Sequence, residues 1–183
     1  MADLSNARVL FLATDGFEES ELFEPRQALI DAGAQVTLAS ISTDPIRGEK
    51  DGEKSERTIT PDLTLGQVDP DQYDALVLPG GVVNPDKLRM EQAAVEIVED
   101  FMDEDKIVAA ICHGPWLLIE ADVVDGRRVT GWPSIRTDLE NAGADVSDEA
   151  VVVDENLITS RNPGDIPAFN EAIIRALAEE LVD

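Results

Sequence analysis

The sequence predicts an α/β fold in which a mostly parallel sheet is covered by helices on both faces. Short apolar runs of strand length alternate along the chain with segments whose apolar residues recur at helical spacing. This alternation is typical of βα units joined by right-handed crossovers. The chain has 183 residues and shows no shift of composition, internal repeat or linker. We therefore expect a single domain over residues 1–183 with a sizeable core.

The first half of the chain carries three of the predicted strands. A helix is expected to start near Ser20, after an Asp-Gly turn, and to end at Gly33. Residues 45–60 are rich in charge and glycine, so we expect an exposed excursion there, a small hairpin without chemistry of its own. The strands are predicted over residues 8–14, 34–40 and 74–78.

The second half continues the alternation. Asn84-Pro85-Asp86 is typical of a helix start, and apolar residues follow at helical spacing as far as Met102. A buried strand at residues 108–111 then leads into a Gly-Pro helix start. Further strands are predicted at 128–131, 151–153 and 157–160, and further helices at 134–142 and 165–181.

The only cysteine and the only histidine are adjacent, Cys112 and His113, between that buried strand and the next helix. A strand-to-helix turn of this kind exposes a side chain at the carboxyl edge of a sheet, where α/β proteins place their sites. The positive end of the helix should lower the thiol pKa and favour the thiolate. A lone cysteine after an apolar strand is also commonly an inert buried hydrophobe. Both interpretations remain open on the pattern alone.

Two more motifs lie at the ends of predicted strands. Pro79-Gly80-Gly81 could bring backbone N–H groups close to a ligand, as an oxyanion site requires, or could be a plain turn. Glu18, Glu19 and Glu21 fall at a helix start, where acidic residues are ordinary capping partners.

Three segments in this order, D-G-F-E-E-S-E-L, L-V-L-P-G-G and A-I-C-H-G-P, resemble the DJ-1/PfpI superfamily. The likeness extends from about Arg8 to Leu177 and is closest to the intracellular PfpI-type proteases and general stress proteins. It implies a flavodoxin-like three-layer sandwich of the class I glutamine amidotransferase type, with the cysteine on a nucleophile elbow. It also implies a homo-oligomer and chemistry without a cofactor.

The resemblance assigns roles to individual residues. Cys112 corresponds to the nucleophile, His113 to the adjacent histidine, and Glu18 to an acid that lies against the thiol and shares a hydrogen bond with it. A carboxyl in such a pocket would have a raised pKa and could serve as a general acid or base. The backbone N–H groups at Gly80, Gly81 and His113 become candidates for binding an oxyanion or the substrate.

In PfpI-type members an acid from a neighbouring subunit completes a triad. The nearest match here is Asp86, which differs from the pattern in two ways. Aspartate replaces glutamate, and the spacing from Pro-Gly-Gly is one residue longer. A role for Asn84 or Asp86 in capping the helix is the alternative.

The charge and composition of the chain limit the kinds of molecule that it is expected to bind. The net charge is -25, from 39 acidic and 14 basic residues. This charge would repel nucleic acid and anionic membranes, so we expect neither as a partner. Acidic residues spread along the chain, with only four lysines among the basic residues, favour adaptation to molar salt. One cysteine and one histidine exclude an internal disulfide and make a metal site improbable. Since the N-terminus shows no signal peptide and no apolar run could span a bilayer, we expect a soluble, cytoplasmic protein.

The expected chemistry is attack of a thiolate on an electrophilic carbonyl, either a small α-oxoaldehyde or an amide. The resemblance implies glyoxalase, deglycase, cysteine peptidase or chaperone activity. We favour a stress-defence enzyme that acts on reactive carbonyls, with an intracellular cysteine peptidase as the alternative. A redox sensor or holding chaperone without turnover is the alternative of another class. Trp116 and Trp132 could line the mouth of a pocket, although packing in the core is the usual role of tryptophan.

Overall fold

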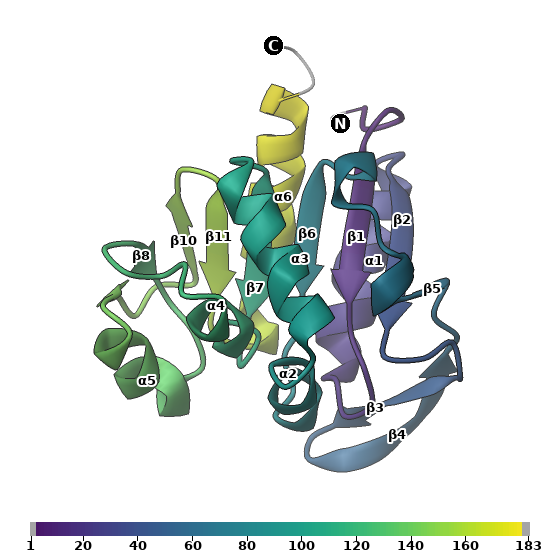
Figure 1. Cartoon of the computed structure of the whole chain (residues 1–183), viewed down its shortest axis with the longest axis horizontal. Helices are drawn as coiled ribbons and strands as arrows, with labels where there is room; N and C mark the ends of the chain where they lie inside the picture. The colour runs from purple at the N-terminus through teal and green to yellow at the C-terminus, as the bar shows by residue number, and fades with distance from the viewer. Residues whose placement is uncertain (1–2, 181–183) are drawn as a thin grey trace.

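The computed structural model describes residues 3–180 and has a seven-stranded central sheet (Figure 1). The strand order is β10-β11-β7-β6-β1-β2-β5. Every neighbouring pair is parallel except β10 with β11. The strands are β1 (Arg8–Leu12), β2 (Gln35–Ser40), β5 (Leu63–Thr64), β6 (Ala75–Leu78), β7 (Ile107–Ile111), β10 (Val151–Asp154) and β11 (Leu157–Ser160). The predicted α/β architecture is confirmed.

Helices cover both faces of this sheet and divide the core into two apolar layers (Figure 1). Alternate residues of each strand point to opposite faces, so Val9 and Phe11 of β1 belong to one layer, whereas Leu10 and Leu12 belong to the other. Helices α1 (Glu19–Asp31) and α6 (Ile166–Glu180) close the first layer. The second layer is closed by α3 (Gln92–Asp103), α4 (Trp116–Glu120) and α5 (Arg136–Asn141).

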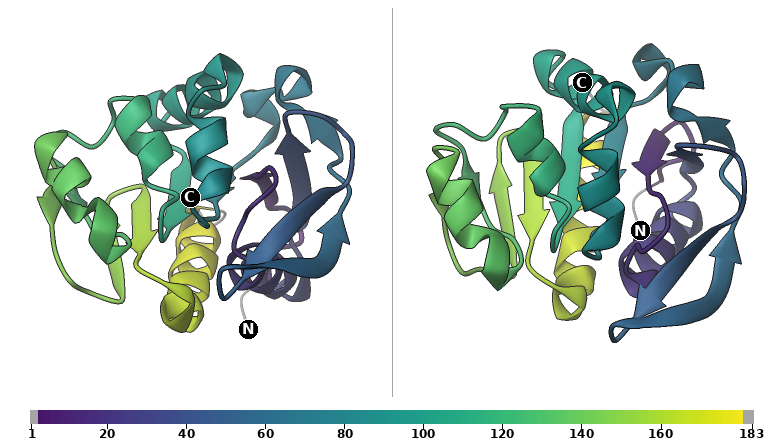
Figure 2. Two further views of the ribbon diagram at one scale, coloured as in Figure 1. Left: turned by 90° about the horizontal axis from the view of Figure 1, so that it is seen from below. Right: turned by 60° about the horizontal axis from the view of Figure 1, so that its bottom comes forward.

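The carboxyl ends of the parallel strands meet at one edge, which is the lower edge in Figure 1. Helix α2 (Val83–Leu88) and the hairpin β3 (Ile46–Lys50) and β4 (Glu53–Ile59) gather at this edge, which Figure 2 brings toward the viewer. The backbone N–H of Glu49 donates to Phe17 O at 2.7 Å, which ties the hairpin to the segment before α1. The hairpin predicted over residues 45–60 is therefore present and lies against the loops that follow the strands.

The structure corrects the helix that was expected to run from Asp86 to Met102. Two helices replace it, α2 and α3, because the backbone is extended at Glu91, directly before α3. Asn84 is not a cap: it is fully buried, its Oδ1 accepts from Thr14 N at 2.8 Å, and its Nδ2 donates to Pro79 O and Gly80 O at 3.0 Å. A side chain used in this way cannot also cap a helix.

The remaining elements are short. The strand expected at 128–131 is only β8 (Arg128–Val129), which pairs with β9 (Asp145–Val146) in a small separate sheet. Neither β9 nor β5 was predicted, because a pairing of two residues depends on the partner strand rather than on a local pattern. The helix expected at 134–142 begins as a 3-10 turn, residues 133–135, before α5.

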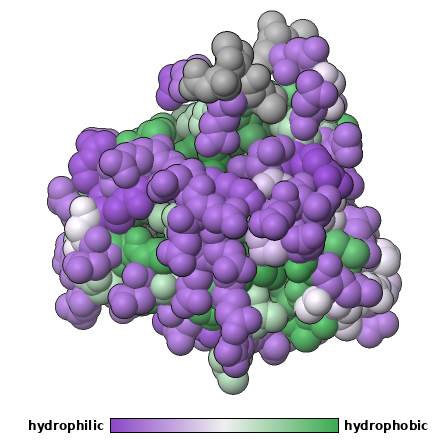
Figure 3. All heavy atoms as spheres, turned by 45° about the horizontal axis from the view of Figure 1, so that its top comes forward, coloured by the Kyte–Doolittle hydropathy of each residue, from purple (hydrophilic) through white to green (hydrophobic). Residues whose placement is uncertain are grey.

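Hydrophilic side chains dominate the face of the molecule drawn in Figure 3, as the net charge of -25 requires. Over residues 3–180, none of the helices is long and apolar enough to cross a bilayer.

Candidate active site

Cys112 lies on a strained turn directly after β7. Its φ of 63° is in the left-handed region, which is rare for any residue other than glycine, and surrounding contacts must maintain it. Cys112 N donates to Ser160 O at 3.0 Å and Cys112 O accepts from Trp132 N at 2.9 Å. Gly114 completes the turn at a place where a Cβ atom would overlap Leu78 O. The nucleophile elbow expected from the sequence is present.

The Gly80-Gly81 turn after β6 lies directly against the elbow. A Cβ on Gly80 would lie 2.7 Å from the Cβ of Cys112, and Gly81 has a φ of 76° with Gly16 O in the space that a side chain would occupy. Glycine is therefore required at both positions. The close approach directs the backbone N–H groups of Gly81 and His113 at the sulfur, where they favour the thiolate.

The acid that contacts the thiol is Glu21, so the expectation that Glu18 makes this contact is wrong. Glu21 is fully buried, accepts from Gly80 N at 2.8 Å through Oε2, and is hydrogen-bonded to Cys112. Glu18 is extended and precedes α1, and its carboxylate accepts from Ser20 Oγ at 3.4 Å. The helical geometry explains the difference, because Glu21 lies on the buried stripe of α1 with Leu22, Pro25 and Leu29.

Burial controls the protonation of this pair. Loss of solvation raises the pKa of Glu21 to about 8, although the hydrogen bonds from Gly80 and Cys112 oppose the rise. Burial also raises the pKa of the Cys112 thiol, and an ionised Glu21 raises it further. The expectation of a lowered thiol pKa is therefore wrong for this chain. The five-residue helix α4 is too short for its dipole to offset the loss of solvation.

His113 supplies a base next to the sulfur. Its Nδ1 lies 3.3 Å from Cys112 Sγ, and its Nε2 lies 3.3 Å from Ser134 Oγ. The ring packs edge-on to Trp116 at 5.1 Å and stacks on Trp132 at 5.8 Å. Burial lowers the pKa of His113, so the imidazole is neutral at pH 7 and can accept a proton. No feature of the sequence pointed to Ser134.

A cavity of about 390 Å³ opens onto these groups. The hairpin expected over residues 45–60 supplies part of the cavity wall, through Glu49, Asp51 and Gly52. Trp132 also lines it, with 37% of its surface exposed, whereas Trp116 Nε1 donates to Asp138 outside the cavity. The lining residues are Glu18, Glu21, Glu49, Asp51, Gly52, Gly81, Val82, Cys112, His113, Trp132 and Pro163.

Asp86 is not part of this cavity within one chain. It lies on α2 with an exposed side chain, and its backbone N–H donates to Val82 O at 3.3 Å. The pairing of Asp86 with a histidine across a subunit boundary therefore stays a prediction. Across residues 3–180, no group of three or more histidine, cysteine or carboxylate side chains is placed to hold a metal ion.

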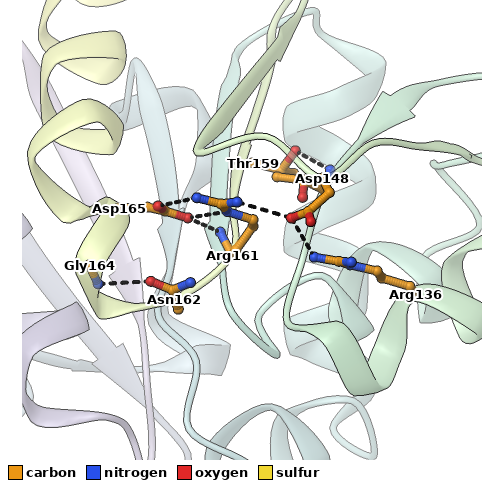
Figure 4. Close-up of polar contacts among 8 residues, drawn as sticks. Arg136, Asp148, Thr159, Arg161, Asn162, Gly164 and Asp165 are labelled. Atoms are coloured by element: carbon orange, nitrogen blue, oxygen red, sulfur yellow. Dashed lines mark hydrogen bonds and ion pairs between the residues drawn. The ribbon is translucent and has the colours of Figure 1, made fainter.

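An ion-pair network joins the segment that follows β11 to the start of α5 (Figure 4). Arg161 donates to Asp165 at 2.8 and 2.9 Å and to Asp148 at 3.0 Å, and Arg136 donates to the same Asp148 oxygen at 2.7 Å. The network links the segment that contains Pro163, a cavity residue, to the start of α5, next to Ser134.

The sequence model of the DJ-1/PfpI family matches residues 7–176. The chain belongs to the DJ-1/PfpI family. A deglycase from Pyrococcus abyssi is 44% identical over 170 residues, which cover 93% of this chain and 99% of that protein. General stress protein 18 of Bacillus subtilis is 43% identical over 171 residues, with coverage of 93% and 97%. Among solved structures, a two-domain protein with DJ-1/PfpI-like and ferritin-like domains from Anabaena variabilis aligns with a TM-score of 0.89 and 39% identity, covering 93% of this chain and 48% of that one.

Proposed function

We propose that this member of the DJ-1/PfpI family is a cofactor-free, cysteine-dependent enzyme that acts on reactive carbonyls in stress defence, as a glyoxalase or deglycase. The observation that carries the proposal is the arrangement of Cys112, Glu21 and His113 on the floor of one cavity. A nucleophile, a buried protonated acid and a neutral base within hydrogen-bond reach are the groups that covalent catalysis at a carbonyl requires.

The directions of the pKa shifts imply that Cys112, Glu21 and His113 are all uncharged before substrate binds. At pH 7 the thiol and Glu21 hold their protons, while His113 is neutral. As Cys112 Sγ attacks the aldehyde carbon of a compound such as methylglyoxal, the thiol proton passes to His113 Nδ1. The carbonyl oxygen gains the negative charge, and the N–H groups of Gly81 and His113 are the candidates for stabilising it. Protonation of this oxygen gives a hemithioacetal.

Two further steps complete a turnover without a redox cofactor. Transfer of a hydrogen from the aldehyde carbon to the adjacent ketone carbon converts the hemithioacetal into a thioester of Cys112. Water then hydrolyses the thioester, releases the hydroxy acid and regenerates the thiol. Glu21 and His113 are the groups that can carry the protons.

The same three residues, Cys112, Glu21 and His113, also fit the removal of a carbonyl adduct from an amine. Attack of the sulfur on the carbon that bears the hydroxyl and the nitrogen forms the C–S bond and breaks the C–N bond. The nitrogen leaves with a proton, and the hemithioacetal that remains follows the route above. A volume of about 390 Å³ lies toward the small end of the range for small-molecule sites, which favours small carbonyls over long peptides.

The proposal is tested by following methylglyoxal loss and hydroxy-acid formation with wild type, Cys112→Ser and Glu21→Gln, alongside a panel of fluorogenic peptides. We expect wild type to turn over methylglyoxal. The rate should fall by at least about 100-fold in Glu21→Gln, and Cys112→Ser should be inactive. Cleavage of peptides with no loss of methylglyoxal would replace the proposal with a cysteine peptidase. Equal suppression of client aggregation by wild type and Cys112→Ser, with no turnover, would replace it with a chaperone.

A further inference from the structure

The ring of His113 is held in one orientation. It packs edge-on to Trp116 at 5.1 Å and stacks on Trp132 at 5.8 Å, and the histidine is only 6% exposed. Its two nitrogens therefore have fixed neighbours, since Nδ1 lies 3.3 Å from Cys112 Sγ and Nε2 lies 3.3 Å from Ser134 Oγ. Across the described part of the chain, no other hydrogen bond to either ring nitrogen is present.

A neutral imidazole carries one proton, and the attack of Cys112 requires that this proton be on Nε2. Only then does Nδ1 keep the lone pair that can take the proton of the thiol. Glu21, which is protonated at pH 7, can donate a hydrogen bond to the sulfur, and this leaves the thiol proton directed at Nδ1. The position of the ring proton then depends on the group that faces Nε2.

Ser134 is well placed to accept a hydrogen bond from Nε2–H. Its side chain is exposed, so the hydroxyl proton can point to water while the oxygen accepts. The 3-10 turn that contains it is fixed to the elbow, because Trp132 N donates to Cys112 O at 2.9 Å and Ile135 is fully buried. The ion-pair network of Figure 4 holds the start of α5, directly after this turn.

We propose that Ser134 is the positioning residue of His113: its Oγ accepts from Nε2–H and so keeps the Nδ1 lone pair on the thiol of Cys112. The inference rests on the proposed function, in which His113 takes the thiol proton. As Sγ attacks the carbonyl carbon, the proton moves from sulfur to Nδ1, and the positive charge of the imidazolium strengthens the bond from Nε2–H to Ser134. Nδ1 gives up this proton in the later steps, so the ring ends in the tautomer in which it began.

One chain then supplies the partners of both ring nitrogens. The family pattern takes a third member from a neighbouring subunit, and Asp86 is the match in this sequence. Under the proposal, that acid is not needed to orient the ring of His113. Because Nε2 carries a single proton, the two assignments can be separated by removing one acceptor at a time.

The tautomer can be read in the resting protein, without turnover. His113 is the only histidine, so protein made without a histidine tag and labelled with ¹⁵N-histidine gives one pair of ring-nitrogen signals, whose positions show which nitrogen carries the proton. Spectra are recorded at pH 8, where the ring is neutral because burial lowers the pKa of His113. Since the thiol favours the same tautomer, the comparison is made in Cys112→Ala, with and without Ser134→Ala.

The ratio of the Nε2–H to the Nδ1–H tautomer should fall about three- to tenfold when Ser134→Ala is added to Cys112→Ala, the factor that one net hydrogen bond contributes. Ser134→Thr keeps the hydroxyl and should preserve the ratio. So should Thr137→Ala, which removes an exposed hydroxyl from α5, and Asp86→Ala. An unchanged ratio in Ser134→Ala, or a fall of the same size in Asp86→Ala, would overturn the proposal.

A kinetic comparison connects the tautomer to the reaction. The kcat for methylglyoxal should fall about three- to tenfold in Ser134→Ala, with little change in KM, and Ser134→Thr should restore it. Equal kcat values in wild type and Ser134→Ala would contradict the positioning role. If wild type turns over no carbonyl, the proposed function fails, while the tautomer ratios still decide whether Ser134 orients His113.

Discussion

Glu21→Gln should change the pH dependence of folding stability in a direction that the burial of Glu21 fixes. The folded carboxyl has a pKa of about 8, compared with an ordinary value of 4.5, so between these values the native state retains a proton that the unfolded chain has released. Stability contributed by this site is therefore intact below pH 4.5 and falls as pH rises toward 8. Glutamine has no proton to lose and can keep the bond from Gly80 N.

The magnitude follows from the linkage relation. Each pH unit in this window costs wild type about 1.4 kcal/mol relative to the variant. The free energy of unfolding of Glu21→Gln minus that of wild type should thus rise by about 3 kcal/mol between pH 5 and pH 7. The difference should become level above pH 8. The remaining carboxylates are common to both proteins and cancel.

The measurement is urea-induced unfolding in molar KCl at half-unit steps from pH 5 to pH 9. Glu18→Gln is the matched control, because Glu18 is only half-buried and receives a hydrogen bond from Ser20, so its difference curve should rise less. A difference curve for Glu21→Gln that stays flat from pH 5 to pH 8 would show that Glu21 is ionised in the folded protein. The account of an uncharged resting site would then be wrong.

Four further outcomes are expected. Iodoacetamide alkylation of folded wild type should have a midpoint at or above the free-thiol value of about 8.5, and Glu21→Gln should lower it; a midpoint well below that value would contradict the burial argument. Mixing Cys112→Ser with Asp86→Ala under subunit exchange should restore part of the activity if Asp86 faces His113 of a second chain, and full activity of Asp86→Ala alone would exclude this. The melting temperature should rise by at least about 5 °C, or roughly 1–2 kcal/mol, from dilute buffer to molar KCl, because screening relieves repulsion under a net charge of -25; an unchanged value would count against adaptation to salt. Asn84→Ala should destabilise the protein by about 1–3 kcal/mol in urea titrations, because the buried Thr14 N–H loses its acceptor, and a change below about 0.5 kcal/mol would refute that role.

The sequence predicted those strands, helices and turns whose positions depend on a local pattern of residues. Apolar runs and turn residues located the six longer strands of the central sheet, β1, β2, β6, β7, β10 and β11. The Cys-His-Gly-Pro segment located the elbow. The short pairings of β5 and β9 were missed because they depend on distant partners. The break between α2 and α3 was missed because apolar residues keep helical spacing across it, whereas the backbone at Glu91 is extended.

The site was predictable to the extent that it follows single motifs. Cys112, His113 and the Gly80-Gly81 turn meet as expected, whereas the acid was placed one helical turn too early. The spacing of Glu21 with Leu22, Pro25 and Leu29 carries the signal that it faces inward. Glu49, Asp51 and Ser134 carry no such signal, because only the packing of the hairpin and of the segment before α5 brings them to the cavity.

Intact-protein mass spectrometry during turnover of methylglyoxal tests the central claim most directly. The account predicts an adduct with the mass of one methylglyoxal molecule that maps to Cys112, forms before product and decays at the turnover rate. Cys112→Ser should show neither adduct nor turnover. Turnover that proceeds in Cys112→Ser, or in wild type with no covalent adduct under rapid quenching, would contradict nucleophilic catalysis by this thiol.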